Sequence, residues 1–267
     1  VTGNTGTTVG DYTFTAKLKD GYAWSDGSTA DYTVGWTINA ATITGVTLAS
    51  TSVTYDGQPH QPQIASVTAN GKTFSTPDTG WTVTYLRNSV ETSDFKNAGT
   101  ITVRVTGTGN LTGLSTDYFT IGTQEIRMDE VVFADLTVTY DGTEKTIKAS
   151  NVPSGVTATY SSNTRTAVGE QQARVTFEPN DKNHTVSLSQ KFATLKIEQA
   201  TITEVALNGT SATYDGQSHK PTIGWVTANN KTFSNVNTGW DVTYLRNGAA
   251  TGDFTIGANA KVSAGLC

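Results

Sequence analysis

Charge, cysteine and long apolar runs are all scarce in this sequence. Only 15% of the 267 residues are charged, and the net charge is −5. Nucleic acids and anionic membrane surfaces are bound by clustered basic side chains, so neither is an expected partner. No apolar run is long enough to be a membrane-spanning helix or the centre of a signal peptide, so we expect no membrane insertion.

The one cysteine, Cys267, is the last residue and cannot form a disulfide within the chain. Secreted eukaryotic β-sandwiches often carry a disulfide between their sheets. Its absence favours a bacterial surface protein, with a cytosolic protein as the alternative. The chain begins with Val1 instead of Met, and we interpret it as a piece of a longer protein.

Helical patterns are missing as well. Met occurs once, and Leu and Ala are not grouped at the spacing of a helix face. Thr, Val, Ile and Tyr are common, and Gly, Asn, Asp and Ser interrupt the apolar runs at short intervals, as is typical of strands joined by turns. The sequence therefore predicts an all-β fold.

Two long segments of the chain are nearly the same. Residues 41–95 and 200–254 align without a gap at a constant offset of 159 residues (200 − 41), and most positions are identical. A weaker copy lies between them, where TVTYDG at 137–142 matches SVTYDG at 52–57 and SATYDG at 211–216. Chance does not produce such agreement, so the chain consists of internal repeats.

The later strands of each repeat also recur, because VGDYTFTAKL at 9–18 resembles the strands that begin with Ala-Gly at 98 and Val-Gly at 168. These matches set the predicted limits of the repeats. The prediction is a closing half at 1–40, complete repeats at 41–125 and 126–199, and an opening half at 200–267. Either the protein continues in both directions, which we favour, or the two halves complement each other between chains in a fibre.

Each complete repeat contains about seven short alternating runs, which is typical of two antiparallel sheets packed as a sandwich. Asn70-Gly71 between apolar flanks predicts a two-residue hairpin. The side chains expected to face the core of the first complete repeat are Val53, Tyr55, Ile64, Val67, Phe74, Trp81, Val83, Tyr85, Ile101, Val103, Val105, Phe119 and Ile121.

The recurring Tyr-Asp-Gly motif, followed in two copies by Gln-x-His-x-Pro at 58–62 and 217–221, carries a family resemblance. With the Ala-Gly or Val-Gly strand openers, it resembles the MBG and YDG-type bacterial immunoglobulin-like repeats. The resemblance implies tandem immunoglobulin-like antiparallel β-sandwiches in a large bacterial surface or secreted protein. It implies no catalytic residue, because the family is defined by scaffold residues.

The motif itself has a structural and a functional interpretation. Asp can bond to its own following backbone, Gly supplies positive φ, and Tyr packs under the turn, so a tight turn is favoured over a sugar or metal site. The structural motif comprises Tyr55, Asp56, Gly57, Tyr140, Asp141, Gly142, Tyr214, Asp215 and Gly216.

Two tryptophans are candidate ligand contacts. Trp225 replaces Ser66 of the other copy, which suggests an exposed position at a junction or a binding patch, and Trp24 lies in a predicted turn. Exposed aromatic rings can stack on sugars, although a lone surface tryptophan more often serves packing. Trp81 and Trp240 are equivalent and are expected in the core.

The sequence offers little for metal binding, catalysis or cross-linking. His60, His184 and His219 have no ligand spacing, so hydrogen-bonded turn histidines are favoured over zinc ligands, and no cofactor is expected. No nucleophile motif is present, so we expect no enzyme activity. Two minor alternatives stay open, namely Lys–Asn isopeptide bonds and calcium at repeat junctions. Their candidate residues are Lys17, Lys96 and Lys148 for the former, and Asp56, Asp78, Asp94, Asp129, Asp135 and Asp253 for the latter.

The expected function is that of structural spacer repeats in an extracellular bacterial surface or secreted protein. The expected partners are neighbouring repeats or head-to-tail copies. The alternative is an adhesive module that binds host or microbial glycans or proteins through exposed aromatics and strand edges.

Overall fold

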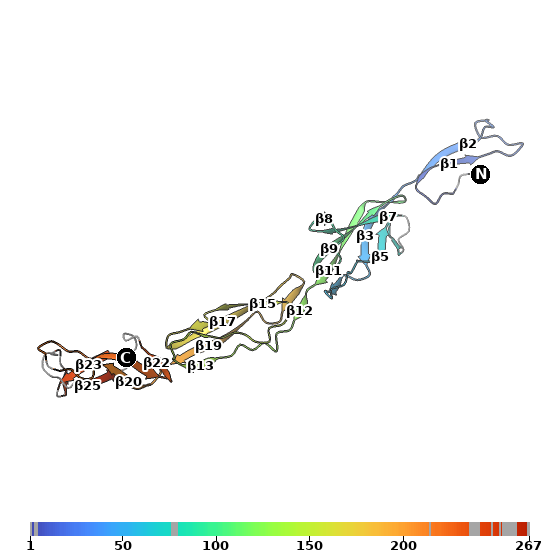
Figure 1. Ribbon diagram of the computed structural model, residues 1–267. Coiled ribbons are helices and arrows are strands. Elements are labelled where there is room, and N and C mark those ends of the chain that lie inside the picture. The colour runs from blue at the N-terminus through green and yellow to red at the C-terminus, as the bar shows by residue number, and fades with distance from the viewer. Residues whose placement is uncertain are drawn as a thin grey trace. The chain divides into compact units, whose positions relative to one another are not determined.

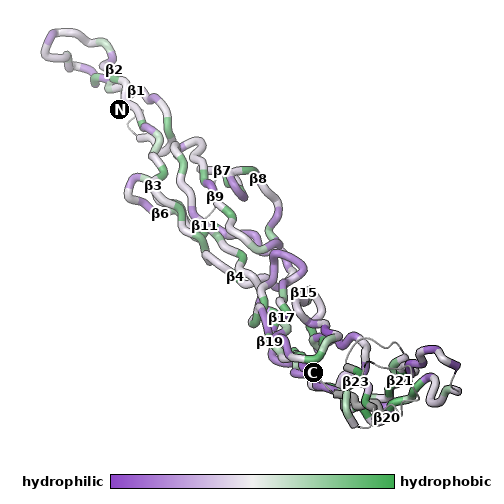
Figure 2. The backbone as a smooth tube through the Cα atoms, turned by 90° about the vertical axis from the view of Figure 1, so that its left-hand side faces the viewer, coloured by the Kyte–Doolittle hydropathy of each residue, from purple (hydrophilic) through white to green (hydrophobic). Residues whose placement is uncertain are grey.

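The computed structural model describes residues 2, 5–75, 80–213, 215–234, 241–246, 248–250, 252 and 261–265. All regular structure in these residues is β (Figure 1), which confirms the all-β prediction. No helix among them is long and apolar enough to cross a membrane. Hydropathy changes over short intervals along the backbone (Figure 2), as expected where strand residues face the core and solvent in turn.

The chain forms two compact units. One contains residues 1–127 with 179–187, and the other contains 128–178 with 188–267. The loop 179–187 therefore belongs to the unit that holds the first complete repeat, although its sequence belongs to the second. The limits of the repeats themselves stay a prediction.

Residues 41–122 form two facing sheets. The first has the strand order β10 (Leu111–Thr112), β3 (Ala41–Leu48), β5 (Ile64–Ala69) and β6 (Lys72–Phe74). The second has the order β4 (Ser52–Thr54), β11 (Leu114–Gly122), β9 (Gly99–Gly107), β7 (Trp81–Arg87) and β8 (Val90–Glu91). Asn70 and Gly71 both have positive φ, 46° and 67°, and join β5 to β6 as the predicted two-residue hairpin.

The core lies between these two sheets. Ile43 of β3 and Val67 of β5 share a buried cluster with Val105 of β9, which belongs to the other sheet, so the sheets pack as in a β-sandwich. A second cluster extends this core. Its members are Leu48, Ile101, Val103, Phe119 and Ile121.

Two predictions about this core are wrong. Phe74 is 39% exposed, because it ends the short edge strand β6. Val83 is 36% exposed. Among the described residues, β8 pairs with β7 only at Leu86 and Arg87, so β7 itself forms the sheet edge at Val83. Trp81 is half-buried against the first cluster, as expected of a core residue, whereas Trp240 lies outside the described residues.

The second complete repeat has a sheet of the same order as β4-β11-β9-β7. Its strands are β13 (Leu136–Thr139), β19 (Gln190–Glu198), β17 (Gly169–Pro179) and β15 (Val156–Ser161). A smaller sheet pairs β14 (Lys145–Thr146) with β16 (Thr164–Arg165). Within the other compact unit, β12 (Gln124–Ile126) pairs in parallel with β18 (His184–Val186). Val175, Phe177, Leu195 and Ile197 are buried.

The C-terminal segment repeats the strands β3, β5, β6, β7, β8 and β9 of the first sandwich, although the residues equivalent to β4, 211–213, form no strand. Its sheets are β20 (Ile202–Asn208), β21 (Thr222–Ala228) and β22 (Lys231–Phe233), and β24 (Ala249–Ala250), β23 (Asp241–Arg246) and β25 (Lys261–Gly265). Val226 pairs with Phe233 as Val67 pairs with Phe74, an offset of 159 residues (226 − 67). The strand register is thus repeated along with the sequence.

The N-terminal segment forms the hairpin β1 (Gly10–Ala16) and β2 (Tyr32–Ile38). The glycine that opens β1 pairs with an isoleucine, as do the opening glycines of β9 and β17. The three pairs are Gly10 with Ile38, Gly99 with Ile121, and Gly169 with Ile197. The hairpin therefore occupies the place of β17 and β19, at the same offset of 159 residues (169 − 10).

Candidate functional site at the Tyr-Asp-Gly turns

Each Tyr-Asp-Gly motif forms a turn in which the aspartate accepts a backbone hydrogen bond. The N–H two residues later donates to Oδ1, from Gln58 to Asp56 at 2.8 Å, Thr143 to Asp141 at 3.0 Å, and Gln217 to Asp215 at 2.8 Å. The glycines have φ of 80°, 77° and 76° at Gly57, Gly142 and Gly216. Only glycine adopts such φ at no steric cost, so the motif sets the turn. Tyr214 lies outside the described residues.

A basic or imidazole side chain four residues after each aspartate completes the turn. His60 and His219 share hydrogen bonds of 2.8 Å with Asp56 and Asp215, and Lys145 Nζ donates to Asp141 Oδ2 at 2.7 Å. The side-chain bonds from His60 and Lys145 are the main cause of the lowered pKa of Asp56 and Asp141. The pKa of Asp215 is lowered mainly by the Gln217 N–H.

In both complete repeats, the short strand before the turn pairs with the long strand β11 or β19. Val53 of β4 pairs in parallel with Ile121, and Val138 of β13 pairs in parallel with Ile197. The tyrosine N–H continues the ladder, because Tyr140 donates to Glu198 O at 2.9 Å. Tyr55 does the same to Gly122 O at 2.8 Å. The motif is therefore held to one sheet edge in both complete repeats.

The tyrosine ring of each described motif contacts a segment of the following repeat. Tyr55 meets the His184 ring edge-on, with ring centroids 5.3 Å apart. His184 Nδ1 and Asp181 Oδ1 share a 2.8 Å hydrogen bond, which is the main cause of the lowered pKa of Asp181. The histidine is thereby fixed against the tyrosine. All three histidines form the predicted side-chain hydrogen bonds.

Tyr140 contacts the hairpin that joins β21 to β22. The rings of Tyr140 and Phe233 stack with centroids 5.9 Å apart, and a Cβ at Gly142 would lie 3.0 Å from the Phe233 ring. Asn229 Nδ2 donates to the carbonyls of Thr139 and Tyr140 at 3.4 and 3.3 Å. Glycine is thus needed at 142 both for its φ and for this contact.

An asparagine contact recurs between successive repeats. The backbone N–H just before the opening glycine donates to an asparagine Oδ1 of the next repeat, from Val9 to Asn110 and from Ala98 to Asn183. Both distances are 2.7 Å. Asn183 Nδ2 also donates to Asn97 Oδ1 at 3.1 Å. We call this recurring contact the asparagine clasp. Sequence reasoning missed it, because Asn110 and Asn183 lie in loops of different sequence.

Neither candidate ligand contact is a freely exposed tryptophan. Trp24 is half-buried, its indole N–H donates to Ala30 O at 2.8 Å, and its ring lies 5.8 Å from that of Tyr32. Trp225 is half-buried on β21, opposite Ala206. Two tyrosines of the same hairpin are more exposed, namely Tyr22 at 70% and Tyr32 at 53%.

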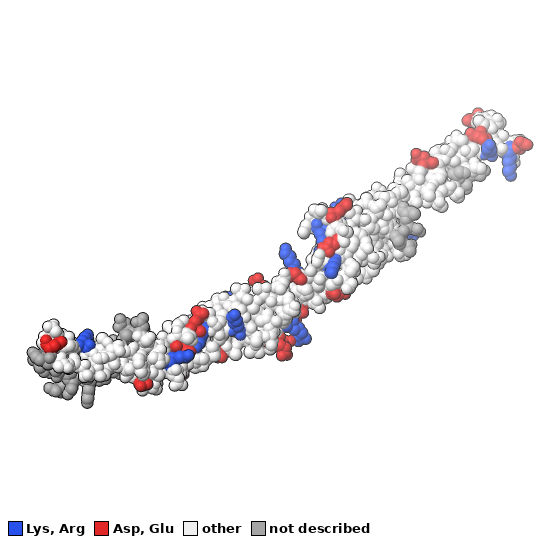
Figure 3. Space-filling model, in the orientation of Figure 1, with Lys and Arg blue, Asp and Glu red and all other residues white. Residues whose placement is uncertain are grey.

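Three of the candidate acidic and lysine side chains, those of Asp94, Asp135 and Lys17, take part in hydrogen bonds or an ion pair within the chain. Asp94 Oδ1 accepts the N–H groups of Lys96 and Asn97, Asp135 Oδ1 accepts that of Thr194, and Lys17 forms an ion pair with Asp31. Asp78 and Asp253 lie outside the described residues. Where the structure is described, no three His, Cys, Asp or Glu side chains converge as a metal site. On the face in Figure 3, acidic and basic groups are interspersed on a largely neutral surface.

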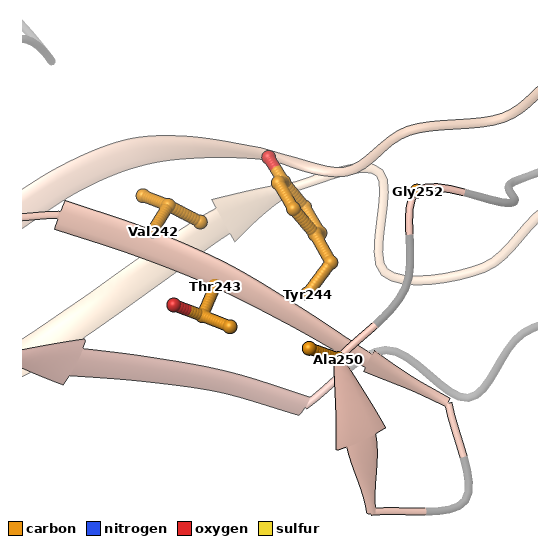
Figure 4. A pocket seen from close by; sticks show the side chains of 5 residues that line it. All are labelled: Val242, Thr243, Tyr244, Ala250 and Gly252. Carbon is orange, nitrogen blue, oxygen red and sulfur yellow. The ribbon is translucent and has the colours of Figure 1, made fainter.

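A hollow on the C-terminal segment is lined by β23 and the residues after it (Figure 4). The side chains of Val242 and Tyr244 point to one side of β23 and that of Thr243 to the other. The Tyr244 hydroxyl donates to Pro221 O at 2.9 Å, so it is already used. The lining residues that the structure describes are Val242, Thr243, Tyr244, Ala250 and Gly252, and none of these five carries a carboxylate, imidazole or thiol.

A scan against protein-family models gives no match to the chain. A search of the curated proteins gives no significant match.

Proposed function

We propose that the chain is an array of immunoglobulin-like repeats that serves as a structural spacer in an extracellular bacterial surface or secreted protein. Its partners are the neighbouring repeats. The observation that carries the proposal is the asparagine clasp, which joins successive repeats through the same atoms at Val9–Asn110 and at Ala98–Asn183. A spacer needs repeats that hold one another in place, and a recurring contact between them supplies that restraint.

The Tyr-Asp-Gly turns act beside the clasp. A protein hydrogen bond contributes about 1 kcal/mol and an aromatic pair about 0.5–1.5 kcal/mol. Tyr55 with His184 and Tyr140 with Phe233 add such pairs. Several small contacts of this size restrict motion between repeats, while each repeat keeps its own hydrophobic core. Such an arrangement suits a spacer.

Small-angle X-ray scattering of the whole chain tests the spacer. Asn183→Ala removes the acceptor of the Ala98 N–H, and we expect a broader distribution of interatomic distances with an unchanged circular dichroism spectrum. Lys182→Ala is the matched control, because Lys182 is an exposed residue of the same loop. Identical scattering of the wild type and Asn183→Ala would count against a restraint at this clasp.

A specific observation also favours a second function, adhesion. The rings of Trp24 and Tyr32 lie together on the N-terminal hairpin, and Tyr32 is 53% exposed. Tyr22, two residues before Trp24 in the sequence, is 70% exposed. Such rings can stack on sugars. A glycan-array signal that is lost in Trp24→Ala or Trp225→Ala would favour adhesion, and its absence in the wild type would leave the spacer alone.

A further inference from the structure

The outward face of β9 carries an arginine between threonines of the neighbouring strands. Val103 and Val105 of β9 are buried in the core. Because strand side chains alternate between the two faces of a sheet, Arg104 belongs to the opposite, outward face. Thr84 of β7 and Thr116 of β11 lie directly opposite Arg104, one on each side. The guanidinium is therefore flanked by hydroxyl groups across the sheet.

Tyr118 of β11 belongs to the same outward face. It pairs with Thr102, the outward residue of β9 next to Arg104, so Tyr118 and Arg104 are diagonal neighbours. Such neighbours lie about 7–8 Å apart, which is close enough for both to contact one sugar. Tyr118 is 58% exposed. We call this group the arginine–tyrosine site, and its members are Arg104, Tyr118, Thr84, Thr102, Thr106 and Thr116.

The polar groups of this site are not used within the described part of the chain. Among the described residues, Arg104 forms no ion pair and no side-chain hydrogen bond, and the same holds for the hydroxyls of Tyr118 and the four threonines. In contrast, Arg87 of the neighbouring strand donates to three backbone carbonyls. A guanidinium has planar paired N–H donors that match a carboxylate. The site thus combines a carboxylate-binding group with hydroxyls and an exposed ring.

An outward arginine beside an aromatic ring also occurs in the second complete repeat. Gly99 and Gly169 are equivalent strand openers, so Arg104 corresponds to Arg174 at an offset of 70 residues (174 − 104). Arg174 is exposed and pairs with Phe192, which is 49% exposed. The second repeat therefore supplies a natural comparison for the first.

The surroundings of the two arginines differ. Phe192 takes the position opposite Arg174 that Thr116 takes opposite Arg104. The outward face around Arg174 also carries charged side chains, because Glu170 lies opposite Lys196. Hydroxyl groups suited to a sugar therefore surround the arginine of the first repeat and not that of the second.

The charges of the first face favour a ligand with one carboxylate. Arg104 is the one cation among the described outward residues of β4, β7, β8, β9 and β11, and Glu91 on the edge strand β8 is the one carboxylate. A polymer with an acid on every sugar would bring further negative charges to this face without a cation for each. A glycan that is acidic only at its terminal sugar leaves no such charge unpaired.

We propose that the arginine–tyrosine site binds glycans that end in an acidic sugar of the sialic acid class. Arg104 donates two parallel hydrogen bonds to the sugar carboxylate, the threonine hydroxyls bond to the sugar hydroxyls, and the Tyr118 ring packs on the apolar side of the sugar. This binding goes beyond the spacer function and does not require the asparagine clasp.

Nuclear magnetic resonance titration of the whole chain tests the ligand and the place where it binds. Sialyllactose should shift the amide signals of Thr102, Arg104, Thr116 and Tyr118, and lactose, which lacks the carboxylate, should not. Shifts of equal size with lactose, or no shifts at these residues, overturn the proposal. Preferential binding of polygalacturonate, which has an acid on every sugar, overturns it as well.

The role of the guanidinium is tested by Arg104→Gln. The affinity for sialyllactose should fall about tenfold or more, as for a lost hydrogen bond to a charged group. Arg104→Lys keeps the charge without the paired donors and should restore only part of the affinity. Arg174→Gln is the matched control, because it makes the same change at the equivalent position. Equal losses in Arg104→Gln and Arg174→Gln would show an effect of net charge alone and refute the site.

The role of the ring is tested by Tyr118→Ala in the same titration. Loss of one aromatic contact should weaken binding about 2- to 12-fold, whereas Tyr118→Phe keeps the ring and should bind nearly as the wild type. Phe192→Ala is the control, because it removes an exposed ring from the other repeat. The ring has no part in binding if Tyr118→Ala and Phe192→Ala behave alike.

Two further variants separate this proposal from the functions above. Asn183→Ala changes the asparagine clasp and Trp24→Ala the N-terminal hairpin, and both should bind sialyllactose as the wild type does. If Asn183→Ala changes the scattering while Arg104→Gln binds normally, the spacer stands and the arginine–tyrosine site fails. If Trp24→Ala abolishes binding, the glycan site lies on the hairpin and the proposal is overturned.

Discussion

Single glycines explain why the strand openers recur. Gly99 and Gly169 have φ of 133° and 119°, and an arginine guanidinium lies against each. Arg87 donates to the carbonyls of Asp94, Asn97 and Ala98, so it fixes the conformation of the loop that precedes β9. A side chain at the glycine would displace the arginine. The glycine is thus required by its neighbour as well as by its backbone.

Gly169→Ala is therefore expected to destabilise the chain by about 1–3 kcal/mol in urea unfolding. A Cβ there would lie 2.5 Å from the Arg165 guanidinium. Gly10→Ala is the matched control, because Gly10 opens β1 with φ of 152° and no atom lies within 4 Å of its Cβ position. If the two variants lose equal stability, the arginine contact is not the reason for the glycine.

Asp181 predicts a pH dependence. Its pKa is lowered from the ordinary 3.8, mainly by the hydrogen bond with His184. Because the folded-state pKa lies below that of the unfolded chain, the stabilisation is complete above 3.8 and is lost as the pH falls through the lowered value. Thermal unfolding between pH 6 and pH 2 should show a smaller loss of stability in Asp181→Asn than in the wild type.

Asp20→Asn, a change in an exposed loop, is the control for that measurement. Parallel curves for Asp181→Asn and the wild type would show that this carboxylate does not contribute.

At the scale of strands and loops, neighbouring residues in the sequence were enough to predict the turns. They were not enough to predict which distant segments the turns and loops contact. Asn70-Gly71 predicted its hairpin, because adjacent residues set the turn type. The asparagine clasp joins residues 101 and 85 positions apart, so no local pattern marks it. Phe74 was wrongly placed in the core, because alternation alone cannot distinguish a core residue from one that ends a short edge strand.

The clasp makes a local prediction. Asn183→Ala removes the acceptor of the Ala98 N–H, so amide hydrogen exchange at Ala98 should accelerate about tenfold or more, corresponding to one lost hydrogen bond. The Gly107 amide, which donates to Gly113 O at 2.9 Å within the sandwich, should exchange as before. Unchanged exchange at Ala98 would mean that the clasp is not formed in solution.

For the whole molecule, the sequence predicted the all-β class and the 159-residue period, and the period reappears in strand register. The sequence could not show how successive repeats meet. Those contacts involve His184, which was expected only to form a hydrogen bond in a turn, and Phe233, which no motif in the sequence marks. The exposed Tyr-Asp-Gly turns gain a role only when the next repeat is placed beside them.

We propose that successive repeats are joined by the asparagine clasp together with the Tyr-Asp-Gly turns beside it. Nuclear Overhauser spectra of the whole chain, with labelled Tyr, Phe and His rings, test it most directly. The account predicts cross-peaks between Tyr140 and Phe233 and between Tyr55 and His184, whose ring centroids lie 5.9 and 5.3 Å apart. Well-dispersed spectra that lack both cross-peaks would contradict it.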